Sequence, residues 1–418
     1  MTRWYVLALM CLGYAINIAD RYVVTTVMEP MRLELHLTDS GIAFLTGIPL
    51  AVYYVTLGIP ISWLADRANR RNILAASLVL WSGMTALCGF SQSYLHFMLA
   101  RIGVGVGEAG GTPPASSIIA DNFTAARRPM AMTVFALGAP LGAWMGADMA
   151  GAVANLYGWR SAFLVLGIPG LILGALVFLT LKEPERGRLD ASDQTTKTSF
   201  AQSMAFLWKQ KAYFHVCMGG GVSALWGWGL IWFTPTFLQR AYHLNVGQAG
   251  GLVGPIHLIA GTLAIVGMAW LLSRRTFDDP RRVCWLVAVG VGLSTIPSFF
   301  AFYTHELWVA QLMFWLFIPA IYFYIGPAMA LIQNLAPAKM RATFIAVSLL
   351  VANVLNLIVA PQAVGFMSDH FAGPAGADAE SLRLALLILA PTGFWAAYHY
   401  WAAAKTIIAE QKLAIGYV

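Results

Sequence analysis

The chain has 418 residues, of which 59% are hydrophobic and only 11% are charged, and its mean hydropathy is +0.68. Because about a quarter of the residues in an ordinary soluble domain are charged, this composition excludes a water-soluble protein and predicts an integral membrane protein. The net charge of +7 comes from loop residues, so we expect contact with anionic lipid headgroups and no nucleic-acid partner.

Apolar segments long enough to cross a bilayer, which takes about 20 residues in a helix, recur along the whole chain. They predict twelve spans, at 4–28, 40–65, 73–91, 95–121, 130–153, 161–181, 212–238, 248–272, 283–302, 307–335, 342–367 and 383–404. The longest polar interruption, 182–211, separates two sets of six. We therefore expect an all-α membrane protein with a six-helix bundle in 1–181, a linker in 182–211 and a second six-helix bundle in 212–418.

The basic residues predict how the spans are oriented, because Lys and Arg concentrate on the cytoplasmic side of a membrane. With the N-terminus inside, twenty of the 26 fall on that side, and only four fall outside: Arg32, Arg160, Arg240 and Arg383. Both termini are therefore predicted to be cytoplasmic. The compact loops and the lack of long tails lead us to expect a monomeric protein of a bacterial inner membrane.

The two halves of the chain resemble each other. DNFTAARRPMA from Asp121 aligns with QNLAPAKMRAT from Gln333, and the basic loop at 67–71 has a counterpart at 274–282. Together with the six-plus-six count, this similarity predicts duplicated bundles with a central site, as in many secondary transporters.

The fourth span contains LARIGVGVGEAGGTPPASS, from Leu99, which matches the G-x-G-x-x-G pattern of dinucleotide-binding loops. Its flanks are too long and too apolar for the strand–turn–helix unit that this function needs. Gly103, Gly107 and Gly111 instead form a stripe of small residues that predicts close contact with another helix. The four cysteines lie in apolar segments at no metal-like spacing. We expect no cofactor, no metal and no disulfide.

Charged residues follow one face of the fourth span and one face of the first. Arg101, Gly105, Glu108 and Thr112 would lie within about 60° of one another on a helix. The first span has a matching polar stripe, formed by Tyr14, Asn17, Asp20, Arg21 and Thr25. A charge near mid-bilayer is costly unless it faces a partner or water. The charges therefore form ion pairs that only join helices, or they mark a proton route.

Burial disfavours the charged form of a carboxyl group, whereas a nearby arginine favours it. An acid whose arginine is drawn away should therefore take up a proton. We hypothesise that Glu108 and Asp20 are the proton-binding residues and that Arg21 and Arg101 are their switchable partners. Asp148, in the fifth span, is assigned no role.

The second half is rich in aromatic residues and has no charge well inside its spans. An apolar aromatic wall opposite a charged wall suits a substrate with an anionic head and an apolar body. We therefore predict a central cavity lined by Tyr14, Asn17, Gly105, Thr112, Trp226, Trp232 and Tyr322, although simple packing is the alternative for each aromatic residue. Interhelical hydrogen bonding is the favoured interpretation of His257, Asn353 and Asn356.

These motifs resemble those of a known superfamily. LADRANRRN, after the second span, resembles the major facilitator signature G-x-x-x-D-R-x-G-R-R, with Ser62 and Asn69 in place of its two glycines. Arg101 with Gly105 resembles a second signature, and GAPLG from Gly138 resembles the bent fifth-span motif of antiporters. The resemblance covers the full length and implies the major facilitator fold. It also implies a cytoplasmic gate formed by Asp66, Arg67, Arg70 and Arg71.

More narrowly, NIADR in the first span, ARIGVGVGEAG in the fourth and the LGAPLG stretch resemble the Spinster family, whose eukaryotic members move sphingosine-1-phosphate and lysophospholipids. The resemblance places Asp20, Arg21, Arg101 and Glu108 at positions that the family uses for proton coupling and headgroup contact.

We therefore predict a proton-coupled secondary transporter that works by alternating access, with an amphiphilic anion such as a lysolipid or a sphingosine-1-phosphate-like molecule as cargo. A transporter of a small organic anion, clamped by Arg21 and Arg101, is the first alternative. An uncoupled lipid scramblase or sensor and a membrane lipid enzyme are the others. The sequence has no G-x-x-x-x-G-K-[ST] motif for ATP hydrolysis and no histidine pair spaced i, i+4 within a span.

Overall fold

A computed structural model of the chain describes residues 2–65, 67–124, 127–185, 200–337, 340–374 and 376–415. Apart from one isolated β-bridge between Gly373 and Gly376, the regular structure in these ranges is helical, as the sequence predicts. The chain divides into two compact units. The first contains Met1–Ser192, Trp232–Thr262 and Ala372–Ala379; the second contains Asp193–Ile231, Leu263–Phe371 and Glu380–Val418.

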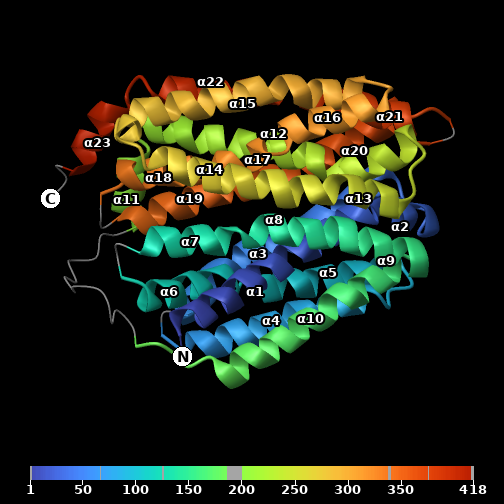
Figure 1. Cartoon of the computed structure of the whole chain (residues 1–418), viewed down its shortest axis with the longest axis horizontal. Coiled ribbons are helices and arrows are strands. Elements are labelled where there is room, and N and C mark those ends of the chain that lie inside the picture. Colours follow the sequence, from blue (N-terminus) through green and yellow to red (C-terminus); the bar gives the residue numbers. More distant parts are fainter. Residues whose placement is uncertain are drawn as a thin grey trace. The chain divides into compact units, whose positions relative to one another are not determined.

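The first unit contains the helices of the N-terminal half and the later segment Trp232–Thr262, which begins within a helix of the second unit (Figure 1). They are α1 (Arg3–Thr26), α2 (Met28–Glu34), α3 (Asp39–Ala65), α4 (Arg70–Cys88), α5 (Tyr94–Glu108), α6 (Thr112–Asn122), α7 (Arg128–Ala136), α8 (Gly138–Trp144), the π-helical turn η1 (Met145–Met149), α9 (Ala150–Tyr157), α10 (Trp159–Thr180), α13 (Val246–Ile256) and the π-helical turn η2 (His257–Gly261). Figure 1 shows α4 and α10 side by side in this unit.

The second unit contains the remaining helices. They are α11 (Phe200–Leu207), the first part of α12 (Lys211–Ala241), α14 (Thr262–Leu272), the 3-10 turn η3 (Arg275–Phe277), α15 (Pro280–Tyr303), α16 (Leu307–Phe317), α17 (Ala320–Phe323), α18 (Ile325–Leu335), α19 (Arg341–Asn353), the π-helical turn η5 (Val354–Val359), α20 (Ala360–Phe371), α21 (Ala379–Leu389), α22 (Thr392–Ala403) and α23 (Ile407–Ile415). Helix α12 enters the first unit at Trp232, so the units differ from the expected bundles, whose boundaries stay a prediction.

Ten helical segments among the described residues are long and apolar enough to cross a membrane. An eleventh is added if α2 and the first part of α3, which meet at a bend of 118°, count as one span. The structure is therefore that of a multi-pass helical membrane protein, and the number twelve stays a prediction.

The fourth expected span, 95–121, is broken, and this corrects the prediction of one continuous helix. Helix α5 ends at Glu108, and α6 begins at Thr112 with Pro113 and Pro114 in its first turn. Proline has no backbone N–H and its ring clashes with the carbonyl one turn earlier, so these residues can start α6 but cannot continue α5. Thr112 therefore does not share the helical face of Arg101 and Glu108.

The glycine stripe of the fourth span packs against α4, as predicted. A methyl group at Gly107 would lie 2.6 Å from the backbone nitrogen of Trp81, and one at Gly111 would lie 3.2 Å from the Trp81 ring. At Gly103 a methyl group would overlap the side chain of Met84. The absence of side chains on this stripe lets α5 lie directly on α4.

The GAPLG motif brings a second helix close to α1, which carries Asp20 and Arg21. A methyl group at Gly138 would lie 2.6 Å from the carbonyl oxygen of Cys11, and one at Gly142 would overlap the carbonyl oxygen of Ala15. The motif thus provides a smooth surface on α8 against which α1 packs.

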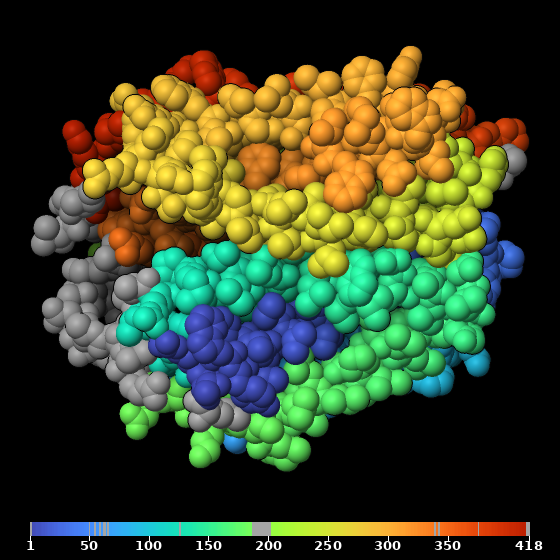
Figure 2. All heavy atoms as spheres, viewed as in Figure 1, coloured from blue at the N-terminus to red at the C-terminus, as the bar shows by residue number. Residues whose placement is uncertain are grey.

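Large apolar side chains cover the outer faces of several helices. In the first unit, Ile172 and Leu179 of α10 are 57% and 76% exposed, and in the second unit Leu263 and Trp270 of α14 are 66% and 59% exposed. Figure 2 shows α10 in green and α14 in yellow at the molecular surface. Exposed apolar surface of this extent indicates contact with membrane lipid.

Candidate functional site

Two ion pairs join α1 to α5 in the first unit. Arg101 Nη1 donates to Asp20 Oδ2 at 2.7 Å, and Arg21 Nη2 donates to Glu108 Oε2 at 2.6 Å. Asp20, Arg101 and Glu108 are 1–2% exposed, whereas the Arg21 side chain is 14% exposed. The pairing is crossed: two adjacent residues of opposite charge on α1 bind two residues of opposite charge that lie seven positions apart on α5. The four predicted charges are therefore brought together in the interior.

The two acids differ in how completely they are hydrogen-bonded. Thr85 Oγ1, on α4, donates to Asp20 Oδ1 at 2.5 Å, so both oxygens of Asp20 have a donor. Glu108 Oε1 is buried and has no hydrogen-bond partner among the described residues. Sequence reasoning missed Thr85, because a single threonine in an apolar span carries no signal of this role. Glu108 is the less satisfied of the two carboxylates.

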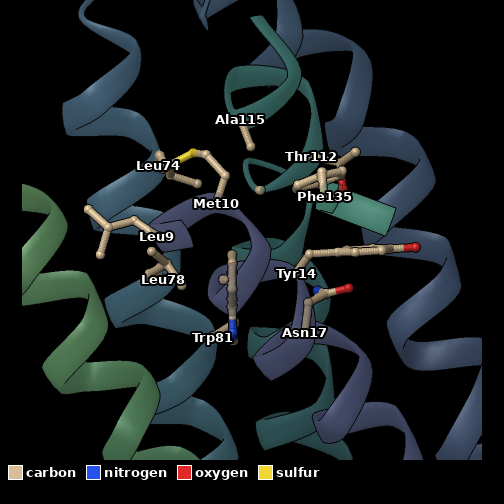
Figure 3. A pocket seen from close by; sticks show the side chains of 12 residues that line it. Leu9, Met10, Tyr14, Asn17, Leu74, Leu78, Trp81, Thr112, Ala115 and Phe135 are labelled. Carbon is tan, nitrogen blue, oxygen red and sulfur yellow. The ribbon is translucent and has the colours of Figure 1, made fainter. Parts of the chain in front are cut away.

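A small cavity lies between α1, α4, α6 and α7 (Figure 3), and none of the four paired charges is among its lining residues. Of the residues predicted for the central cavity, Tyr14, Asn17 and Thr112 line this small cavity, Gly105 is buried in α5 and does not, and the central cavity itself stays a prediction. The Tyr14 ring stacks on Phe135 with 4.8 Å between ring centroids. The cavity volume is about 20 Å³, which holds about one or two water molecules. A larger substrate would require the surrounding helices to move apart.

The three aromatic residues predicted from the second half have different surroundings. Trp226 is fully buried, its Nε1 donates to Ser298 Oγ at 3.1 Å, and its ring centroid is 5.1 Å from that of Phe317. Packing inside the second unit accounts for these contacts. Trp232 lies in the first unit, 6.2 Å from Tyr22, and Tyr322 is 3% exposed. None of the three lines the cavity in Figure 3.

The predicted cytoplasmic gate residues are only partly described, because Asp66 lies outside the described residues. Arg70 is buried, and it donates to Glu183 Oε1 at 2.7 Å and to Asp121 Oδ2 at 2.5 Å. The backbone nitrogen of Arg71 donates to Glu183 Oε2 at 2.9 Å. Arg70 therefore joins the start of α4 to the end of α6 and to the segment after α10, and the gating role stays a prediction.

One further position of this motif, Asn69, has a plain structural explanation. Asn69, which replaces a signature glycine, is the N-cap of α4, where its side-chain oxygen accepts from the backbone nitrogen of Asn72 at 3.0 Å. Asparagine is among the best residues for this position, so the replacement preserves the helix start. Arg67 is exposed, and the Ser62 side chain lies outside the described part of the structure.

A second buried ion cluster was missed by sequence reasoning, and we call it the Arg240 cluster. Arg240, at the end of α12, donates to Glu29 Oε2 at 2.6 Å and to Asp39 Oδ1 at 2.7 Å. Arg32 donates to Glu29 Oε1 at 2.9 Å. All four side chains are at most 15% exposed. One feature of the sequence could have indicated this cluster: Arg32 is one of the few basic residues of the predicted outer loops, and Glu29 and Asp39 lie close to it at the ends of two spans. Arg240 is another of these few basic residues.

Asp148 and His257, two further polar residues of the spans, each have a partner in the structure. Asp148 Oδ2 accepts from Trp144 Nε1, one turn earlier, at 2.9 Å. The Nδ1 atom of His257 lies 3.5 Å from the hydroxyl oxygen of Tyr22, which joins η2 to α1 as the expectation of interhelical hydrogen bonding predicts. Asp148 therefore needs no functional explanation.

Comparison with known proteins adds the family. Residues 10–361 match the model of the Major Facilitator Superfamily. The chain belongs to the major facilitator superfamily. An MFS-type efflux pump of Mycolicibacterium smegmatis is 30% identical over 98% of this chain and 95% of its own length. Protein spinster homolog 1 of Xenopus tropicalis is 29% identical over 96% of this chain and 80% of its own length. The sphingosine-1-phosphate transporter SPNS2 of Mus musculus is 26% identical over 87% of this chain and 69% of its own length.

Solved structures of this superfamily agree with the fold. Two crystal structures of a bacterial homolog of the human lysosomal transporter Spinster, inward-facing and either unoccupied or occupied, match with TM-scores of 0.83 and 0.84. Each is 28% identical and covers 98% of both chains. The protein is thus a multi-pass membrane transporter related to Spinster and to sphingosine-1-phosphate transporters. The family and its solved members are transporters, which excludes the alternative of a membrane lipid enzyme.

Proposed function

We propose that this transporter couples the movement of an amphiphilic anion to the movement of protons by alternating access. The observation that carries the proposal is the crossed pair of buried ion pairs, Asp20 with Arg101 and Glu108 with Arg21. Buried ion pairs are a poor source of stability, whereas acids inside a membrane commonly mark ion or proton routes. Their position supports a functional role over a purely structural one.

Glu108 is the first candidate for proton binding, and Asp20 is the second. Arg21 is the most exposed of the four charged side chains, so an incoming anion would bind it first. Among the described residues Arg21 is the cation that donates to Glu108, so Glu108 would then lose this partner and would become neutral by binding a proton, because an unpaired buried carboxylate is strongly disfavoured. Asp20 would keep the bond from Thr85 if Arg101 moved away. On this mechanism the anion and the proton promote each other's binding.

The lining of the cavity supports an amphiphilic cargo. Figure 3 shows Tyr14 and Asn17 on one side of the cavity and Leu9 and Leu78 on the other. The polar side includes Asn17, one turn before Arg21 on α1, and suits an anionic headgroup, whereas the apolar side suits an alkyl chain. A lysolipid or a sphingosine-1-phosphate-like molecule fits this division better than a small organic anion does.

The Arg240 cluster supports alternating access. It ties the end of α12 to α2 and to the first turn of α3 within the first unit. Opening of the transporter toward the predicted outer side of the membrane would break these bonds, and closing would form them again. We further propose that both termini are cytoplasmic, because the basic loops follow the positive-inside pattern. We also propose that the protein is a monomer of a bacterial inner membrane.

Uptake by proteoliposomes tests the proposal. Purified transporter is reconstituted with labelled sphingosine-1-phosphate or lysophosphatidic acid outside, with and without a pH gradient, and a short-chain carboxylate is assayed in parallel. We expect the lysolipids to accumulate above equilibrium only with the gradient. Equilibration independent of the gradient would indicate a scramblase, and accumulation of the carboxylate alone would indicate the small-anion alternative.

A further inference from the structure

We propose that the second unit holds an anionic membrane phospholipid, which is not the transported cargo, in a cavity between α11, α12 and α19. The cavity has a volume of about 320 Å³, within the range of cavities that bind small ligands. Its apolar walls are formed by Leu207, Trp208, Phe214, Met218, Val347 and Val351. It shares no residue with the ion pairs of the first unit.

The rim of this cavity provides the cation that an anionic headgroup needs. Lys211 lines the cavity and is exposed, and Lys209, two residues earlier, is exposed as well. Trp208 is 73% exposed. Lysine and tryptophan together are typical of the level of the lipid headgroups, where the phosphate meets the cation and the indole stays at the interface. A soluble anion would use the lysines but would leave the apolar walls without an occupant.

Gln210 adds a feature that is specific for the headgroup. It lines the cavity and is 4% exposed, and its Nε2 donates to the carbonyl oxygen of Leu335 at 3.0 Å. Its Oε1 is buried and has no hydrogen-bond partner among the described residues. An acceptor without a donor is unfavourable in the interior, and a headgroup hydroxyl would supply the donor. The chemistry therefore points to a phospholipid with one negative charge and headgroup hydroxyls, as in phosphatidylglycerol.

Such a lipid would contact three helices at once. One of its two acyl chains would lie against α12 and α19, while its headgroup would bind the segment between α11 and α12 together with Lys211 at the start of α12. Because a ligand that binds only the folded state stabilises that state, occupancy should raise the thermal stability of the protein without changing which cargo is moved.

Native mass spectrometry and thermal unfolding test the site on the full-length protein in detergent. The probes are phosphatidylglycerol, phosphatidylcholine, phosphatidic acid and inorganic phosphate. We expect phosphatidylglycerol to bind and to raise the melting temperature, phosphatidic acid to bind more weakly, and the other two to have no effect. The double variant Lys209→Gln, Lys211→Gln should weaken the binding of phosphatidylglycerol about thirtyfold, whereas Lys182→Gln, an exposed lysine of the first unit, should not change it.

A second variant keeps the lysines and blocks the apolar walls. Val351→Trp should remove the bound lipid, as read by native mass spectrometry; because Val351 packs against Gly221 of α12, the melting temperature without lipid should fall as well. Equal binding of phosphatidylglycerol and phosphatidylcholine, stabilisation by phosphate alone, or retention of lipid by Val351→Trp would each overturn the proposal. Equal binding of phosphatidic acid would overturn the role of Gln210. Because cargo uptake is not the readout, failure here is distinct from failure of proton coupling.

Discussion

Glu108 and Asp20 each accept two hydrogen bonds, but the bonds are distributed differently over the carboxylate oxygens, and this difference separates their roles. Asp20 receives donors on both carboxylate oxygens, from Arg101 and Thr85. Glu108 receives donors on one oxygen only, both from Arg21. A proton added to Glu108 can therefore settle on an oxygen that no other described residue uses, whereas a proton on Asp20 Oδ1 requires the Thr85 hydroxyl to turn its hydrogen to the carbonyl oxygen of Trp81, 2.9 Å away.

Replacing Glu108 with glutamine should abolish the pH dependence of cargo uptake. Glutamine has the same shape but cannot exchange a proton with the solvent, and Arg21 would be left without its anionic partner. Proteoliposome uptake measured between pH 5.5 and 8 checks this, and we expect gradient-driven accumulation to fall to the level of protein-free vesicles.

The matched control for this variant is Asp148→Asn. Asp148 also lies within an expected span, but its partner is Trp144 on the same segment, so its replacement should leave the pH profile unchanged. If Glu108→Gln kept the wild-type profile, Glu108 would not be the coupling residue.

At the scale of elements, close packing of α4 and α5 positions the charges on α5. The side chain of Gly107→Ala would lie 2.6 Å from the Trp81 backbone nitrogen, and such overpacking destabilises by about 1–3 kcal/mol. We expect a clearly lower melting temperature. Gly267→Ala, on α14, is the control, because a methyl group there would meet no atom within 4 Å. Equal melting temperatures for the two variants would show that this contact is not a tight one.

The Arg240 cluster gives a second prediction at this scale. Arg240→Gln removes one arginine partner from both Glu29 and Asp39, and breaking a buried ion pair costs about 3–5 kcal/mol. We expect conformations that are open toward the predicted outer side of the membrane to become more populated. In a background without the native cysteines, Thr26→Cys, at a fully buried position, should then react faster with a membrane-impermeant thiol reagent.

The comparison variant for the Arg240 cluster is Arg160→Gln. Arg160 pairs with Glu34 where both side chains are 33–49% exposed, and exposed pairs contribute little. Its replacement should leave the labelling rate at Thr26→Cys unchanged. A rate that is the same in Arg240→Gln would contradict the gating role of the cluster.

Some of these element contacts were predictable from sequence and others were not. The small-residue stripe and the polar stripe of α1 follow from helical periodicity, which fixes the residues on one face. Periodicity does not fix how far two helices rotate or slide, so the pairing of Asp20 with Arg101 could not be predicted. The break at 109–111 was missed because the apolar run continues through it, although Pro113 and Pro114 were visible. The Arg240 cluster was missed because loop charges were treated as solvated.

At the scale of the molecule, the four arginines predicted to face outward have a common property. Each of them forms an ion pair with an acid in the structure: Arg32, Arg160, Arg240 and Arg383. Their positive charge is therefore compensated locally. The positive-inside rule counts Lys and Arg and not net charge, so this pairing is a local feature of the structure and the orientation stays a prediction.

Labelling from the two sides of the membrane checks the predicted orientation. Single cysteines replace Lys182 and Tyr157, both exposed, in a variant without native cysteines. In intact cells, an impermeant thiol reagent should modify Tyr157→Cys and should modify Lys182→Cys only after the membrane is opened. The reverse pattern would invert the topology and would place the Arg240 cluster on the cytoplasmic side.

The order of charges on α1 and α5 also restricts how these helices can move. Asp20 and Arg21 are neighbours, so any slide that placed Asp20 beside Glu108 would set acid against acid. The charges of α1 and α5 therefore attract each other in the observed alignment of the two helices and repel each other in an alignment that brings the two acids together. We therefore expect α1 and α5 to move together as a rigid body. The rearrangement that admits cargo should then occur at the contacts of α1 with other helices.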